Sequence, residues 1–149
     1  MQAQMLAPAA VLVLWSLVML YWMAATRGPA MKKMEGGLGA AKPGGRGQDL
    51  EGRIPDRVNW IAHNYTHLME QPTIFYPAVI ILALVGSTGL DILLAWIYVG
   101  MRIIHSIWQA TVNKVPVRFL MFLVSTIALT ILAIRAVMAT LFANPAALS

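Results

Sequence analysis

The side chains best suited to chemistry lie in two apolar parts of the chain, at intervals of three or four residues. Residues spaced in this way share one face of a helix. Histidine can move protons near neutral pH, and arginine binds carboxylates through two parallel hydrogen bonds. The first face carries His63, His67 and Glu70, the second carries Arg102, His105 and Gln109, and Arg118 follows shortly after.

Three interpretations of these two faces remain open. In the first, they form a buried polar network that holds helices together, with Glu70 neutralising Arg102. In the second, Arg102 and Arg118 line a pocket for an anionic small molecule, and the histidines transfer protons. In the third, a metal is bound by histidines and a glutamate, which the spacing of His63 and His67 permits. The arginine partner expected for Glu70 favours the two interpretations without a metal.

The elements that must position these residues are predicted to span a membrane. The 149 residues are 59% hydrophobic and 11% charged, whereas soluble domains carry about 25% charged residues. The sequence therefore predicts an all-α bundle of four transmembrane helices in a single domain, residues 1–149. The expected spans cover residues 6–25, 60–85, 90–112 and 117–142, and the second helix is expected to begin near Asp56 and to run on unbroken.

The distribution of charge predicts the topology. Seven of the eleven Lys and Arg residues lie between Arg27 and Arg57, so the net charge of +5 indicates membrane orientation rather than nucleic-acid binding. Residues 28–55 are rich in Gly and Pro and are expected to form a flexible cytoplasmic loop. The run over 6–25 exceeds the apolar core of a signal peptide and lacks a basic start, which favours a spanning helix. The chain has no cysteine and hence no thiolate of its own.

Two further features have structural interpretations. Asp91 and Arg135 are predicted to lie at similar depth on the last two helices, where we expect them to form a structural pair. The sequence Asn64-Tyr65-Thr66 fits the N-glycosylation pattern, but it falls within a predicted helix on the cytoplasmic side, and we interpret it as a chance match.

Two stretches resemble a known family of membrane proteins. HNYTHLMEQPTIFYPAV begins at His63, and RIIHSIWQATVNKVPVRF begins at Arg102. Together with the four spans and the basic first loop, they are similar to the membrane-associated proteins in eicosanoid and glutathione metabolism (MAPEG), and in particular to the bacterial branch. The resemblance covers about residues 56–141. It implies a homotrimer in the bacterial inner membrane, with glutathione bound between subunits near the cytoplasmic face.

The resemblance also implies roles for individual residues. Arg118 would contact the glutathione thiol and favour its thiolate form in a transferase or peroxidase reaction on lipophilic electrophiles. Where glutathione-using members carry R-x3-N-x2-E, this chain has His63 and His67, and where they carry R-x2-Y-x3-Y it has His105 and Gln109. The alternative is therefore a non-catalytic membrane subunit that keeps the fold and docks a larger complex. The glutathione-binding set implied is His63, His67, Glu70, Arg102, His105 and Gln109.

Overall fold

The computed structural model describes residues 1–142, and the regular elements of this part are helices. Four segments are long and apolar enough to cross a membrane: α1, α2 together with α3, α4, and α5. The predicted all-α, four-span architecture is confirmed. The helices are α1 (Gln2–Lys32), α2 (Asp56–Leu68), α3 (Pro72–Val85), α4 (Gly89–Thr111) and α5 (Val115–Leu141), and the connector between α1 and α2 contains two short 3-10 helices, η1 (Gly37–Ala40) and η2 (Gly47–Leu50).

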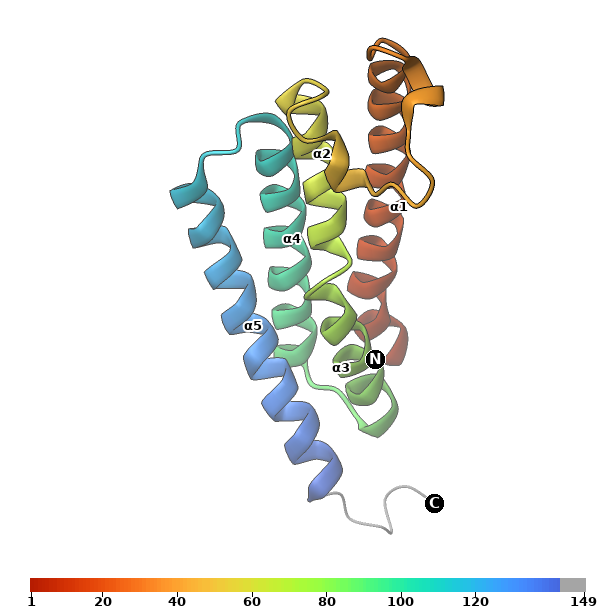
Figure 1. The fold of residues 1–149 in the computed structure, drawn as a ribbon. Coiled ribbons are helices and arrows are strands. Elements are labelled where there is room, and N and C mark those ends of the chain that lie inside the picture. The colour runs from red at the N-terminus through yellow and green to blue at the C-terminus, as the bar shows by residue number, and fades with distance from the viewer. Residues whose placement is uncertain (143–149) are drawn as a thin grey trace.

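The helices run side by side along one common direction (Figure 1). Helix α1 packs against α2, α3 and α4, while α5 packs against α4 and α3. The connector and the turn between α4 and α5 lie at one end of the bundle, and the N-terminus and the turn between α3 and α4 lie at the other. Because α4 contacts α1, α2 and α5, polar side chains on α4 can meet partners from three directions.

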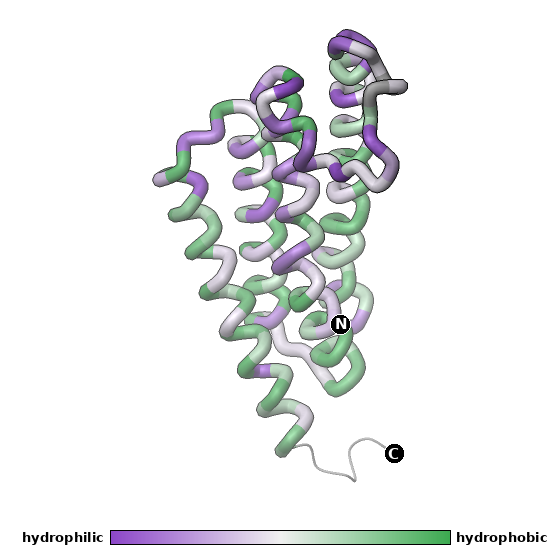
Figure 2. Tube along the Cα trace, in the orientation of Figure 1, coloured by the Kyte–Doolittle hydropathy of each residue, from purple (hydrophilic) through white to green (hydrophobic). Residues whose placement is uncertain are grey.

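The surface of the bundle is apolar along most of its length. Large side chains such as Leu14, Leu84, Ile127 and Leu141 are exposed. Hydrophilic residues gather toward the end that carries the connector, as Figure 2 shows. Water would disfavour so much exposed apolar surface, whereas lipid tails accommodate it. The chain is therefore a multi-pass integral membrane protein that sits in lipid.

The second span is interrupted, and the expectation of one unbroken helix from Asp56 to Val85 was wrong. Helix α2 ends at Leu68 and α3 begins at Pro72. Proline has no backbone N–H, so Pro72 cannot donate to the carbonyl four residues earlier, and its ring crowds the preceding turn. The break leaves the backbone carbonyl of His67 without its usual partner four residues later, and the candidate site lies around this residue.

The ends of the other helices also differ from the predicted bounds. Helix α1 continues to Lys32, so the first part of the expected loop 28–55 is helical. Helix α5 begins at Val115 and follows a tight turn in which Asn113 adopts a positive φ of 54°. Asparagine tolerates this left-handed conformation better than most residues. The last seven residues of the predicted 1–149 domain lie outside the described residues.

Candidate functional site

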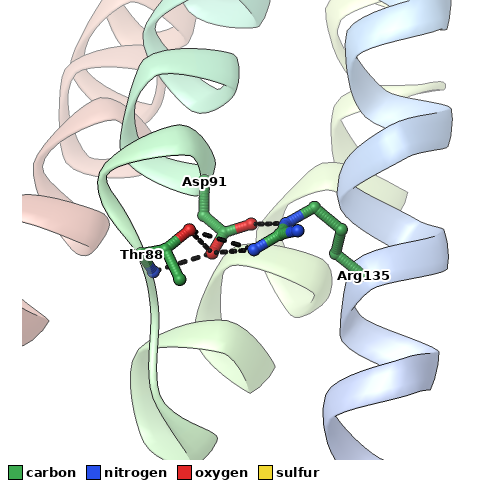
Figure 3. Close-up of polar contacts among 3 residues, drawn as sticks. All are labelled: Thr88, Asp91 and Arg135. Carbon is green, nitrogen blue, oxygen red and sulfur yellow. Dashed lines mark hydrogen bonds and ion pairs between the residues drawn. The ribbon is translucent and has the colours of Figure 1, made fainter.

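A fully paired charged cluster lies at the start of α4 (Figure 3). Asp91 is buried, and its carboxylate accepts hydrogen bonds from the backbone N–H of Thr88 at 2.8 Å and from the Thr88 hydroxyl at 2.8 Å. Arg135 on α5 donates to both carboxylate oxygens, with Nη2 3.1 Å from Oδ2, and Nη2 also donates to Thr88 Oγ1 at 2.9 Å. We call Thr88, Asp91 and Arg135 the Asp91 clamp. The predicted pair of Asp91 and Arg135 is confirmed.

Arg102 lies further along α4 and has 0% exposure. Its Nη2 donates to His67 O at 3.0 Å and to His67 Nδ1 at 3.1 Å. The guanidinium carbon lies 6.0 Å from the centre of the Tyr98 ring and 5.8 Å from that of Phe122, close enough for weak cation–π attraction. Nε and Nη1 are buried and have no hydrogen-bond partner within residues 1–142. Arg102 is therefore a buried cation with two unused donor groups.

The interruption of the second span supplies one of the two acceptors used by Arg102. The N–H of Gln71 would bond to His67 O in a continuous helix, but Gln71 precedes Pro72 and belongs to the start of the next helix. The carbonyl instead receives a 3.4 Å contact from Glu70 N and the hydrogen bond from Arg102. The interruption between α2 and α3 thus leaves the carbonyl of His67 free to accept from the buried guanidinium.

The rings of His67 and His105 stack with centroids 4.9 Å apart and planes inclined by 20°. The edge of His67 also meets Phe122, with ring centroids 5.5 Å apart. Arginine N–H groups only donate, so Nδ1 of His67 is the acceptor and its ring proton lies on Nε2. We call His67, Arg102, His105 and Phe122 the Arg102 layer.

A small cavity of about 170 Å³ adjoins this layer. His67, His105 and Arg118 contribute its polar lining, and Phe119 and Phe122 are among its apolar walls. Arg118 lies in the first turn of α5, where Nη1 donates to Asn113 Oδ1 at 2.6 Å. The N-terminus of a helix carries a partial positive charge, so both Arg118 and the start of α5 favour an anion here.

The remaining predicted site residues lie apart from this cavity or lack the expected partner. His63 is exposed, and its Nε2 lies 3.0 Å from Glu51 Oε1 of the connector. Glu70 is exposed at the interruption and forms no direct ion pair with Arg102 within the described chain, so the expected pairing of the two side chains was wrong, although the Glu70 carboxylate is near enough to act on the guanidinium through space. Gln109 is buried on α4, and its Oε1 has no hydrogen-bond partner among the described residues.

A group of three hydrogen-bonded side chains beside the Arg102 layer was not predicted from the sequence. Ser106 Oγ accepts from Trp15 Nε1 at 3.0 Å and from Asn64 Nδ2 at 2.6 Å, which joins α1, α2 and α4. Asn64 has 0% exposure, which supports the interpretation of its glycosylation pattern as a chance match. Asn64 could have been identified from the sequence by its position three residues before His67, which places both side chains on the same face of the helix.

Metal ligation by the histidines has no geometric support in the part of the chain that the structure describes. No group of three or more His, Cys, Asp or Glu side chains is arranged to hold a metal ion among these residues. His63 faces the connector, whereas His67 and His105 stack against each other. The residues of the metal interpretation are therefore dispersed.

The fold and the site define the class of protein as a four-span integral membrane protein with a buried cationic layer between its helices. The model of the MAPEG family matches residues 5–138. The chain belongs to the MAPEG family, and the match extends the resemblance through α1. No curated protein and no solved structure matches the chain.

Proposed function

We propose that this MAPEG protein is a glutathione-dependent transferase or peroxidase that acts on lipophilic electrophiles reaching it from the bilayer. The observation that carries the proposal is that the buried guanidinium of Arg102 forms no direct ion pair within residues 1–142. A buried charge is costly unless it is paired and hydrogen-bonded. No acidic side chain within residues 1–142 forms an ion pair with Arg102, so an anionic ligand would compensate a charge that the chain itself leaves unpaired.

The residues present fit glutathione in chemical type. Its carboxylates match the guanidinium of Arg118, which lines the cavity, and the buried charge of Arg102 lies directly behind the His67 wall. Glutathione supplies the nucleophilic thiol when bound. Arg118 and the N-terminus of α5 would stabilise a thiolate next to them, and His67 would present its Nε2 proton for donation.

The size of the cavity supports a site shared between subunits. Small-molecule sites usually enclose about 300–1,000 Å³, whereas one chain encloses about 170 Å³ beside Arg118. We propose that a homotrimer completes the site and that a neighbouring subunit supplies the missing wall. The large apolar side chains exposed along α5 give the bundle a face on which a second copy can pack.

We further propose that the connector between α1 and α2 faces the cytoplasm and that the protein resides in the bacterial inner membrane. The concentration of Lys and Arg between Arg27 and Arg57 supports this orientation. The end of the bundle that carries the connector also carries the start of α5, so Arg118 would open toward the same compartment.

The alternative is a non-catalytic membrane subunit that docks a larger complex. The contacts of the Arg102 layer favour it, because His67 on α2 meets both His105 on α4 and Phe122 on α5. A polar layer with these contacts can hold three helices together without binding a ligand.

Purified protein in detergent separates the two functions. Glutathione at a hundredfold excess over its Kd would stabilise the folded protein by about 2.7 kcal/mol. We expect millimolar glutathione to raise the melting temperature and to support turnover of 1-chloro-2,4-dinitrobenzene or of an organic hydroperoxide. Absence of both effects would contradict the enzyme proposal and favour the non-catalytic subunit.

Arg118→Ala tests the assigned role of the α5 arginine. We expect turnover to fall by roughly a hundredfold, as for loss of a charge-stabilising donor, while the trimer stays intact by light scattering. Arg57→Ala, which removes an exposed arginine from the first turn of α2, is the matched control and should retain activity. Unchanged turnover in Arg118→Ala would remove this residue from the mechanism.

A further inference from the structure

The connector between α1 and α2 folds back along the end of α1 (Figure 1). Side chains of both segments line the largest of the described cavities, about 640 Å³, which is partly open to solvent. This volume lies within the range of small-molecule sites. Four basic side chains line it, Arg27 from α1 and Lys42, Arg46 and Arg53 from the connector. The cavity is separate from the Arg102 layer and from the cavity beside Arg118.

The lining carries an excess of positive charge. Four basic residues against one acid, Asp49, leave a net charge of +3. Asp49 is engaged locally, since its Oδ2 accepts a hydrogen bond from the backbone N–H of Arg46 at 2.7 Å. Within residues 1–142, none of the four basic side chains forms an ion pair. The cavity is therefore suited to an anion that brings more than one acceptor oxygen.

Arg27 is held in place by the connector. One of its terminal nitrogens, Nη2, donates to Gly47 O, and Nε is buried without a hydrogen-bond partner in the described chain. A Cβ atom at residue 47 would lie 2.7 Å from Nη1 and 3.1 Å from Nη2 of Arg27. Glycine at this position allows the backbone to approach the guanidinium, which couples the shape of the connector to the position of one cation.

The position of the cavity indicates an amphiphilic ligand. The uncharged stretch of α1 ends at Arg27, so this side chain lies where the apolar part of the helix ends. Met31, Met34 and Leu50 give the cavity an apolar wall. An adjoining cavity of about 400 Å³ shares Arg27, Arg46 and Gly47 with it and extends along α1 to Met23. The adjoining cavity is lined mainly by polar side chains. A ligand with a charged head beside the four cations and an apolar tail against Met31, Met34 and Leu50 therefore matches the larger cavity.

We propose that this basic cavity binds the phosphate headgroup of an anionic phospholipid from the leaflet on the connector side. Phosphate oxygens would accept hydrogen bonds from Arg27 and Arg46, while Lys42 and Arg53 balance the remaining charge. Clusters of basic residues beside a spanning helix attract anionic lipids, and here the glycine-containing connector gathers the cluster around one concave site.

Native mass spectrometry of the full-length protein released from detergent tests the proposal. We expect phosphatidylglycerol to be retained at one molecule per chain, and phosphatidylcholine with the same acyl chains to be lost. Arg27→Gln and Arg46→Gln should each reduce retention of phosphatidylglycerol roughly tenfold, as for loss of a hydrogen bond to a charged group. Arg57→Gln, an equal change of charge outside this lining, is the matched control.

Gly47→Ala tests the shape of the site without changing its charge. The added methyl group would force the flexible end of Arg27 to shift, so retention of phosphatidylglycerol should fall, by less than in Arg27→Gln, because the charge is kept. Gly39→Ala is the control, because a Cβ there meets no atom within 4 Å. The melting temperature of each variant in detergent shows whether the protein is folded, and the exposed Arg46 supplies a substitution that does not disturb buried contacts.

Equal retention of the two lipids, or equal loss in Arg46→Gln and Arg57→Gln, overturns the proposal. Displacement of the lipid by an equal concentration of glycerol 3-phosphate overturns the lipid as ligand and assigns the site to soluble phosphate compounds. Arg118→Ala should leave phosphatidylglycerol retention unchanged. A negative result with glutathione would therefore contradict the proposed enzyme function and leave the lipid site untouched, and a negative result with the lipids would do the reverse.

Discussion

The Asp91 clamp and the Arg102 layer lie on the same helix, and each contains a buried charged side chain of α4. In the clamp, the carboxylate of Asp91 receives hydrogen bonds from Thr88 and from the guanidinium of Arg135. In the layer, Arg102 donates hydrogen bonds to a neutral imidazole nitrogen and to one carbonyl oxygen, and two of its donor groups remain unused within residues 1–142. A satisfied ion pair holds two helices together, whereas an incompletely paired cation is suited to binding something else.

Removal of the Asp91 carboxylate should have the largest effect on the free energy of unfolding. Asp91→Ala removes the carboxylate that pairs with Arg135 and accepts the Thr88 N–H, and we expect the free energy of unfolding to fall by about 3 kcal/mol. Denaturant titration in mixed micelles measures this change. The double variant Asp91→Ala/Arg135→Ala should recover part of the loss, because it no longer leaves an unpaired arginine. A loss below about 0.5 kcal/mol in the single variant would contradict a structural role for the clamp.

Ser106→Ala examines the hydrogen bonds beside the Arg102 layer. The hydroxyl accepts from Trp15 Nε1 and Asn64 Nδ2, so its removal leaves two donors without a partner and should cost about 2 kcal/mol. Intrinsic fluorescence should also change, because the indole of Trp15 loses its acceptor. Thr126→Ala, which removes the acceptor of a single hydrogen bond from Gln71, provides the control and should cost less. Equal losses in the two variants would show that Ser106 has no special part in joining the helices.

Thr88→Ala weakens the clamp without removing either charge. The hydroxyl donates to Asp91 and accepts from Arg135 Nη2, and we expect its loss to cost about 1 kcal/mol. Thr88→Ser preserves the hydroxyl and should remain within about 0.5 kcal/mol of the unmodified protein. Equal destabilisation by Ala and Ser would show that the methyl group, rather than the hydrogen bonds, provides the contact.

Arg102→Met should have the smallest effect on stability in the absence of ligand. Methionine keeps an unbranched chain of similar shape and removes the unpaired charge, so we expect a change within about 1 kcal/mol. Stabilisation by glutathione should disappear in the same variant. A loss as large as that of Asp91→Ala would show that both clusters hold helices together, and it would favour the non-catalytic subunit.

The parts of the fold that could be predicted are those that follow from patterns along the sequence itself. Uncharged runs of sufficient length predict the spans, and the matched depths of Asp91 and Arg135 were enough to predict their pairing. The interruption before Pro72 was missed because the polar stretch of α2 and the apolar stretch of α3 were taken as two halves of one span, although a proline within a helical pattern is a recognised signal for a break.

The candidate site was predicted only in part, for the same reason. The grouping of His63, His67 and Glu70 assumed a helix that continues through all three, and α2 ends at Leu68. Glu70 therefore leaves the shared face, and His63 meets Glu51 of a connector whose path no periodicity describes. His67, Arg102 and His105 do meet, because each lies within a regular helix at matching depth.

The Asp91 clamp also has a consequence for how the chain enters a bilayer during synthesis. A lone arginine within a spanning helix opposes transfer into lipid, less strongly near the helix end than at its centre, and Arg135, near the end of α5, acquires its counter-ion only when α4 is beside α5. The turn between these helices is short, so Asp91 and Arg135 can meet as soon as both segments have left the ribosome. We therefore expect α4 and α5 to insert into the membrane together as a hairpin, with Asp91 and Arg135 already paired.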